Sequence, residues 1–322
     1  MKYRSTACLG FFFLSLITAS CKSDKAAVNG TAAAASKASI TRGDNTAMEN
    51  NMIAPGATPQ LIARQFSFTE GPAADKQGNV YFTDQPNDKI WKYDTDGKLS
   101  VFMNSTRRAN GLYFDRNGNL LACADEQNQL VSISPQGEVT VLVQNFQGHR
   151  LNGPNDVWAA PDGGIYFTDP LYKRDYWDQQ PDVAGEKVYY LAKGQSQPVV
   201  AAEDLVKPNG LVGTPDGKYL YIADIGGNNT YKYKIGPGGK LQDKQLFVVQ
   251  GGDGMTIDNR GNVYLAGKGV TVFNPAGEQV AHIDIPEDWT ANVCFGGKNH
   301  DLLFITASKA IYTLQMNVQG VQ

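Results

Sequence analysis

One segment recurs six times along the chain, and this repeat constrains the fold more than any other feature. Each copy has a glycine turn, an apolar strand, a polar turn and a second strand, as in GNVYFTDQPNDKIWKYD. The copies begin at Gly78, Gly118, Gly163, Gly217, Gly261 and, in degenerate form, His300, at intervals of 40, 45, 54, 44 and 39 residues. Repeats of this length with several short strands are typical of β-propellers with four-stranded blades.

The 261 residues from Thr58 to Val318 hold six such units of about 43 residues each. The competing fold is a pair of β-sandwich domains, which would also contain many short strands and turns. Two sandwiches give no reason for a repeat that keeps its phase over six copies. We therefore predict an all-β, six-bladed β-propeller with four-stranded blades over residues 58–322.

Oxygen-bearing side chains occupy the same register position in every repeat, eight residues before its start. These ring residues are Glu70, Asn110, Asn155, Asn209, Asp253 and Asn292. Equal register in a propeller means equal height and radius, so we expect the six side chains to converge on a central channel. Carboxylate and amide oxygens suit a hard cation such as Ca²⁺, and the ring has no His or Cys for zinc or copper. The alternative is that Asn-Gly and Asp-Gly recur only because each blade begins with an Asx turn.

Several motifs resemble those of the gluconolactonase/regucalcin (senescence marker protein) family of six-bladed, calcium-dependent lactonases. The longest is HRLNGPNDVWAAPDGGIYFTDPLY at 149–172, and shorter ones are Glu-Gly-Pro at 70–72, Asn-Gly-Leu at 209–211 and Asp-Gly-Met at 253–255. The resemblance extends from about residue 66 to residue 314. It implies a metal-dependent hydrolase that opens sugar or aldonic acid lactones such as gluconolactone. The implied cofactor is Ca²⁺, with Mg²⁺, Mn²⁺ and Zn²⁺ as other candidates.

The resemblance also implies roles for individual residues. Glu70, Asn209 and Asp253 would bind the metal, and Asn155 would be a fourth ligand or a substrate contact. Asp253 would also be the general base, taking a proton from the water that attacks the lactone carbonyl. Arg150 lies near the position of a substrate-binding arginine in the family. Asn110 and Asn292 extend the ring by register alone and are expected to contact substrate.

The longest interval between repeats contains an insertion at residues 170–185. It carries three aromatic side chains, Tyr172, Tyr176 and Trp177, among charged residues. Insertions at the end of a blade can wall a pocket, and aromatic faces pack well against sugar rings, so we expect these side chains to form a substrate lid. The alternative is that they pack on the neighbouring blade without touching a ligand.

The N-terminus has the pattern of an export signal. Residues 1–20 contain Lys2 and Arg4, a short apolar run and small residues before Cys21, which is typical of a bacterial lipoprotein signal peptide. We expect Cys21 to be lipidated and residues 21–57, rich in Ala and Ser, to form a flexible tether. The protein is then a cell-envelope lipoprotein that contacts the membrane only through this anchor. The other cysteines of the mature chain, Cys123 and Cys294, are expected to be buried free thiols.

Composition and missing motifs exclude several other functions. The net charge is −3 and no Lys/Arg-rich block is present, so nucleic acid is not an expected partner. The chain also has no Gly-rich phosphate loop, Gly-x-Ser-x-Gly elbow or His-Glu-x-x-His pair. Three functions stay open: a lactonase, a phosphotriesterase like diisopropylfluorophosphatase, and a non-catalytic propeller that binds carbohydrate or protein. A small-molecule lactone is the expected partner, and a monomer is favoured.

Overall fold

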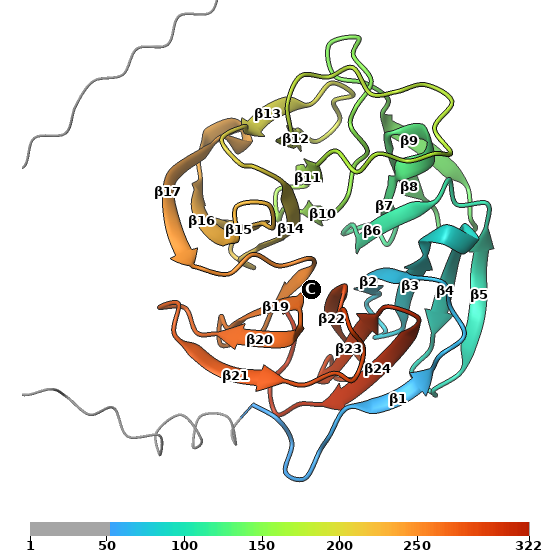
Figure 1. The fold of residues 1–322 in the computed structure, drawn as a ribbon, viewed down its shortest axis with the longest axis vertical. Helices are drawn as coiled ribbons and strands as arrows, with labels where there is room; N and C mark the ends of the chain where they lie inside the picture. Colours follow the sequence, from blue (N-terminus) through green and yellow to red (C-terminus); the bar gives the residue numbers. More distant parts are fainter. Residues whose placement is uncertain (1–51, 322) are drawn as a thin grey trace, which may run out of the picture. The chain divides into compact units, whose positions relative to one another are not determined.

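Residues 52–321 are described by the structure, a computed structural model, and their regular elements are strands and three short 3₁₀ turns. The strands form six four-stranded antiparallel sheets arranged as blades around a central axis (Figure 1). The predicted all-β, six-bladed propeller is therefore confirmed. No helix in the described part is long and apolar enough to cross a membrane.

The blades follow one another along the chain, each running from an innermost to an outermost strand. Blade 1 contains β2 (Thr69–Ala74), β3 (Val80–Asp84), β4 (Lys89–Tyr93) and β5 (Leu99–Asn104). Blade 2 contains β6 (Ala109–Phe114), β7 (Leu120–Ala124), β8 (Gln129–Ile133) and β9 (Val139–Val143). Blade 3 contains β10 (Val157–Ala159), β11 (Ile165–Asp169), β12 (Lys187–Leu191) and β13 (Val199–Ala202).

The second half repeats this plan, except that its last sheet borrows a strand from the start of the domain. Blade 4 contains β14 (Pro208–Gly213), β15 (Tyr219–Asp224), β16 (Asn229–Ile235) and β17 (Leu241–Val248). Blade 5 contains β18 (Met255–Ile257), β19 (Val263–Gly267), β20 (Gly269–Phe273) and β21 (Gln279–Ile283). Blade 6 contains β22 (Asn292–Gly296), β23 (Leu302–Ala307), β24 (Ala310–Gln315) and β1 (Gln60–Ala63). The 3₁₀ turns are η1 (Gln85–Asn87), η2 (Asp125–Gln127) and η3 (Pro237–Gly239).

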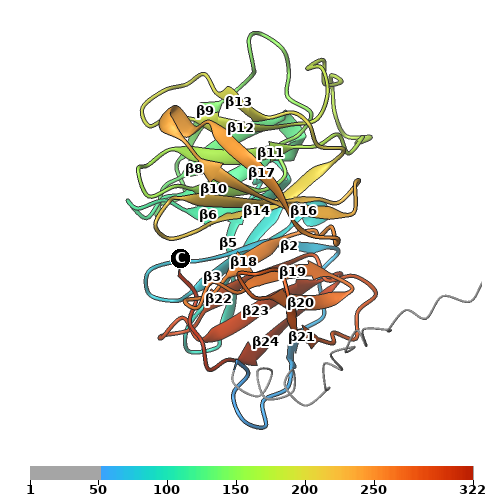
Figure 2. The same ribbon diagram turned by 90° about the vertical axis from the view of Figure 1, so that its left-hand side faces the viewer.

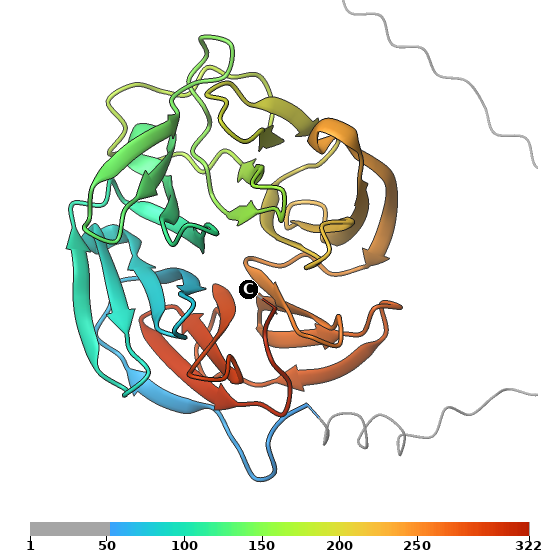
Figure 3. The same ribbon diagram turned by 180° about the vertical axis from the view of Figure 1, so that it is seen from behind.

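The ring closes because β1, from the beginning of the domain, pairs with β24 from its end. The two strands are antiparallel, with Gln60 opposite Thr313. Figure 1 shows this blue strand beside β24, and Figure 2 shows the same ring of blades from the side. On the opposite side of blade 6, the last described residues approach the axis, where Gly320 bridges Asp258 (Figure 3). The first strand of the domain is thus held by blade 6, and its last residues bridge to blade 5.

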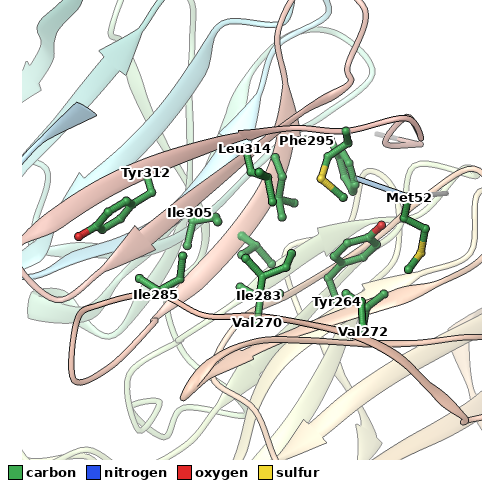
Figure 4. Close-up of a cluster of buried hydrophobic side chains, with 14 of the residues drawn as sticks. Met52, Tyr264, Val270, Val272, Ile283, Ile285, Phe295, Ile305, Tyr312 and Leu314 are labelled. Atoms are coloured by element: carbon green, nitrogen blue, oxygen red, sulfur yellow. The ribbon is translucent and has the colours of Figure 1, made fainter. Parts of the chain in front are cut away.

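The domain begins earlier than the sequence analysis predicted. Met52 is buried beside Tyr264 and Val272 (Figure 4), and Ile53 forms a bridge with Met316. The tether boundary predicted at residue 57 is therefore wrong for residues 52–57, because the apolar side chains of Met52 and Ile53 pack on blades 5 and 6. The remainder of the predicted tether, the signal peptide and Cys21 lie outside the described residues.

Aspartates and glycines shape the turns that begin several of the repeats. The Asp75 carboxylate accepts hydrogen bonds from the backbone N–H groups of Gln77 and Asn79. Gly78 completes this turn with φ of 86°, a left-handed conformation that glycine adopts without steric cost. The same arrangement recurs at Asp115 and Asp258, which explains the regular spacing of these residues in the sequence.

Buried aspartates at the ends of second strands hold the loops that lead to the axis. Asp84 accepts the N–H groups of Ser67 and Phe68, and Asp169 accepts those of Asn152 and Gly153. Asp224 does the same for the corresponding loop of blade 4. We call these three residues the strand-end aspartates; the corresponding residue of blade 2 is Ala124, which lies opposite Gln129 as Asp84 lies opposite Lys89. In blades 1, 3 and 4 they fix the two residues that lie two and three positions before the ring residue.

The two cysteines of this domain are buried and unreactive. Cys123 and Cys294 are buried free thiols, as predicted. Cys123 lies in β7, the second strand of blade 2, and Cys294 in β22, the innermost strand of blade 6. Burial raises the pKa of both thiols, so neither is poised to react as a thiolate at neutral pH.

Met52 provides a test of the corrected boundary. Met52→Ala should lower the free energy of unfolding by about 2–3 kcal/mol, because it leaves a cavity among packed side chains. Leu61→Ala is the matched control, since Leu61 also precedes β2 but is exposed, and it should cost less than about 1 kcal/mol. Urea unfolding measures both values. Equal losses, or no loss for Met52→Ala, would place residues 52–57 in the tether after all.

Candidate functional site

The six ring residues lie where the innermost strands begin, and all six side chains are buried. Glu70 and Asn110 are the second residues of β2 and β6, and Asn209 is the second residue of β14. Asn155 and Asp253 lie two residues before β10 and β18, and Asn292 begins β22. The predicted common register is therefore present in the structure.

Five of the six ring residues line a single cavity of about 450 Å³. The complete lining is Phe68, Glu70, Gln85, Pro86, Asn110, Asn155, Tyr172, Arg174, Asn209, Ile225, Asp253 and Trp289. Asn292 does not line the cavity but contacts it indirectly, because its Nδ2 donates to Glu70 Oε2 at 3.2 Å. The structure thus gathers four amides and two carboxylates from six different blades.

The glycines next to the ring residues are required for a reason other than turn formation. A Cβ atom at Gly71 would collide with the carbonyl oxygen of Asn110, and one at Gly210 would collide with that of Asp253. The Gly210 N–H donates to Asp253 O at 2.7 Å, which joins the innermost strands of adjacent blades. Close approach of neighbouring blades therefore requires the glycines. It does not explain why the residue before each glycine carries an oxygen.

Burial makes the carboxylates at the centre reluctant to ionise. Burial raises the pKa of Glu70 well above its usual range, and the nearby Asp253 raises it further. Burial likewise raises the pKa of Asp253 to about 6 and that of Asp156 to about 7. Asp156 follows a ring residue directly; its charge raises the pKa of Glu70, and the charge of Asp253 raises the pKa of Asp156. A cation at this position would favour the ionised form of all three groups.

The donor set fits a hard divalent cation better than a transition metal. The Oδ1 atom of Asn110 is buried without a hydrogen-bond partner in the described part of the chain, which leaves an oxygen available beside the cavity. Within residues 52–321, no group of three or more His, Cys, Asp or Glu side chains is arranged to hold a metal. Any ion at the ring would therefore need amide oxygens in addition to Glu70 and Asp253, as Ca²⁺ accepts.

Several side chains predicted to contact substrate lie elsewhere. Arg150 donates from Nε to Asn128 Oδ1 at 2.7 Å and does not line the cavity. Trp177 is buried, with its Nε1 donating to the carbonyl oxygen of Asp125, and Tyr176 donates its hydroxyl to the Asp125 carboxylate. These contacts pin the insertion to blade 2. Tyr176 and Trp177 therefore pack on the neighbouring blade, as the alternative interpretation of the insertion expected, and they do not line the cavity.

Tyr172 is the aromatic residue of the insertion that lines the cavity. Its hydroxyl oxygen accepts a hydrogen bond from Asn209 Nδ2 at 2.9 Å. Because the amide nitrogen of Asn209 is engaged by Tyr172, its amide oxygen is the group left to meet a cation. Tyr172 thus orients a ring residue as well as walling the cavity.

The sequence analysis missed the indole of Trp289. Trp289 lines the cavity and donates from Nε1 to Asp253 Oδ2 at 2.7 Å. It lies three residues before the ring residue of blade 6, and Phe68 lies two residues before that of blade 1. The residues two and three positions before a ring residue therefore supply part of the cavity lining. Their common register could have identified them from the sequence.

Gln85 and Ile225 were also missed. Each directly follows a strand-end aspartate, Asp84 or Asp224, and lines the cavity. No repeated sequence pattern pointed to Asp156 or Arg174. Asp156 replaces the glycine found beside most ring residues, and Arg174 lies in the insertion, whose side-chain directions no repeat determines.

Comparison with known proteins is consistent with this geometry. The gluconolactonase of Zymomonas mobilis is 28% identical to the chain over 297 residues, which cover 82% of this chain and 83% of the relative. The solved structure of a gluconolactonase from Xanthomonas campestris, XC5397, has a TM-score of 0.76 at 28% identity and covers 82% of this chain and 91% of its own. The structure of regucalcin from Agrobacterium tumefaciens, a calcium-binding protein, has a TM-score of 0.69 at 18% identity and covers 82% and 95%. At 18% identity the likeness shows the fold alone.

A family model provides the broader assignment. The SMP-30/gluconolactonase/LRE-like region matches residues 68–309, which are 242 of the 322 residues. The matched span begins just before the first ring residue and ends in blade 6, so it contains the whole cavity lining. The chain belongs to the SMP-30/gluconolactonase/LRE-like family.

Proposed function

We propose that the protein hydrolyses sugar or aldonic acid lactones at the ring, with a bound divalent cation, Ca²⁺ in the first instance. The observation that carries this proposal is the convergence of five ring residues on one cavity, with the Asn110 oxygen unpartnered and the carboxyls of Glu70 and Asp253 buried beside it. The gluconolactonase names of two relatives support the same reaction.

Glu70, Asn155, Asn209 and Asp253 are the residues that would hold the cation. When bound, the ion supplies a Lewis acid that polarises the lactone carbonyl and stabilises the negative charge that develops on its oxygen. Asn110 would add its free oxygen to the ion or to a substrate hydroxyl. Asn292 acts behind this set, because its amide holds one oxygen of Glu70.

Asp253 is the proposed general base. Its carboxylate takes a proton from water as the water oxygen bonds to the carbonyl carbon. The ring C–O bond then breaks, and the proton passes from Asp253 to the departing alkoxide oxygen, which leaves a hydroxy acid. The Trp289 N–H, donated to Oδ2, fixes the orientation of this carboxylate during both transfers.

Cation dependence tests the proposed reaction. The domain should open glucono-δ-lactone well above the spontaneous rate, lose this activity in chelator and regain it with added Ca²⁺. Paraoxon, assayed in parallel, tests the phosphotriesterase alternative. Turnover of paraoxon but not of the lactone would replace the proposal, and turnover of neither would favour a binding propeller.

Asp253→Asn separates binding of the ion from proton transfer. An amide oxygen can still coordinate but cannot take a proton, so kcat should fall by about 100-fold or more even at saturating Ca²⁺. Glu70→Gln is the matched comparison, because it removes the other ring carboxylate without removing the base. Its loss should be recovered largely by raising Ca²⁺. If Asp253→Asn keeps near-normal turnover at saturating Ca²⁺, another group is the base.

The raised pKa values predict how stability depends on pH without a cation. The folded state keeps protons on Asp253 and Asp156 up to about pH 6 and 7, whereas the unfolded state releases them near pH 4. The unfolded state therefore binds fewer protons in this window, and these groups lower the free energy of unfolding as pH rises from about 4 to 7.

A bound cation should reverse this effect. The increase in melting temperature that Ca²⁺ produces over chelator should be larger at pH 7.5 than at pH 5.0, since the ion must displace protons at the lower pH. Differential scanning calorimetry at the two pH values measures the difference. An equal or smaller increase at pH 7.5 would show that the buried carboxyls do not hold the ion.

A further inference from the structure

Arg174 differs from every other residue that lines the cavity because it is positively charged. It lies in the insertion between β11 and β12, and no Lys or other Arg belongs to the described lining. Its side chain is 27% exposed, so the guanidinium is accessible from the cavity without being free in solvent. A single positively charged side chain beside acidic and amide groups requires a physical explanation.

An aspartate outside the repeated strand-end pattern, Asp125, holds Arg174 in place. In blades 1, 3 and 4 the strand-end aspartate binds two backbone N–H groups of the loop before the ring residue. In blade 2 that loop is held instead by Asp88, which accepts the Arg108 N–H at 2.7 Å. The strand-end position of blade 2 is Ala124, and Asp125, the next residue, accepts Arg174 Nε on its Oδ2 at 2.8 Å. Asp125 therefore binds the insertion and not the loop before the ring residue.

Asp125 is itself held firmly, so the direction of the Arg174 side chain is defined. It is buried, and its Oδ2 also accepts Gln85 Nε2 at 3.0 Å and the Tyr176 hydroxyl at 2.5 Å. The Tyr172 ring lies 5.6 Å from the guanidinium carbon. The aromatic face and the carboxylate together restrict the guanidinium without using most of its donors.

The two Nη groups of Arg174 are the donors left over. Among residues 52–321, the hydrogen bonds of Arg174 run from Nε alone, so four N–H bonds of the guanidinium have no protein acceptor. Guanidinium presents these bonds as a planar fork that matches the two oxygens of an oxyanion. If Arg174 served only to hold the insertion in place, its two Nη groups would not need to line the cavity.

We propose that Arg174 binds an anionic substituent of the substrate, a carboxylate, sulfonate or phosphate, and so makes acidic sugar lactones the preferred substrates. This inference rests on the proposed lactone hydrolysis at the ring. Because the ring residues take the carbonyl end, the substituent at Arg174 lies at the remote end of the sugar. The fork pairs with the oxyanion, and the Tyr172 ring beside it covers the sugar face.

Two matched pairs of lactones test this specificity. 6-Phosphoglucono-1,5-lactone is compared with glucono-1,5-lactone, and glucaro-1,4-lactone with glucono-1,4-lactone, so that each pair differs only in the remote group. The wild-type domain should prefer the anionic member by about tenfold or more in kcat/KM in at least one pair, and the pair concerned shows whether phosphate or carboxylate is recognised.

Arg174→Gln and Lys207→Gln form the matched variants. Lys207 lies 4.7 Å from the same Tyr172 ring but does not line the cavity, so its loss removes the same charge from outside. Arg174→Gln should lower kcat/KM for the anionic lactone by about 10- to 100-fold, mainly through KM, with less than about a threefold change for the neutral one. Lys207→Gln should change neither by more than about threefold. Calorimetric melting confirms that both variants are folded.

The outcomes separate this inference from the proposed function. Hydrolysis of neutral lactones with no preference for the anionic members leaves the proposed function standing and overturns the role of Arg174. Equal losses on both members in Arg174→Gln also overturn it, because the arginine would then only hold the insertion. Hydrolysis of no lactone removes the proposed function and, with it, this inference.

Discussion

Close contact between the innermost strands of neighbouring blades is the constraint on which the site depends. Gly111 donates to Asn155 O at 2.8 Å, and Gly210 and Gly254 make the equivalent bonds to Asp253 O and Ala291 O at 2.7 Å. Each bond fixes the height of one strand against the next. The side chains that precede these glycines are therefore brought to one level, where their oxygens converge. A larger residue at Gly71 or Gly210 would push the blades apart and scatter the ring.

The same contact creates an electrostatic problem at the axis. Glu70, Asp156 and Asp253 are buried near one another: the charges of Asp253 and Asp156 raise the pKa of Glu70, and that of Asp253 raises the pKa of Asp156. The positively charged side chain that lines the cavity, Arg174, pairs with Asp125 instead. Buried carboxylates without a counter-charge either keep their protons or bind an ion. The proposed cation thus serves the fold and the reaction together, because it offsets the repulsion and polarises the substrate.

Repetition made the blades and the ring predictable from the sequence, since a fixed register in each repeat becomes a fixed place in space. The strand β1 and Met52 were not predictable in this way, because they occur once and gain their structure only by pairing with the other end of the chain. The site was likewise predictable where it follows the register, as at Glu70 and Asn209. Arg174 and Trp289 lie on loops, where partners such as Asp125 and Asp253 set the direction of the side chain. Tyr176 and Trp177 show the same limit, since composition suggested a pocket wall and Asp125 draws both side chains away from it.

A crystal structure grown with Ca²⁺ tests the central claim most directly. We expect one ion on the propeller axis, with oxygens of Glu70, Asn155, Asn209 and Asp253 at about 2.3–2.6 Å and water or Asn110 completing the coordination. An ion bound at a different place, or a ring that stays without an ion at saturating Ca²⁺, would contradict the claim.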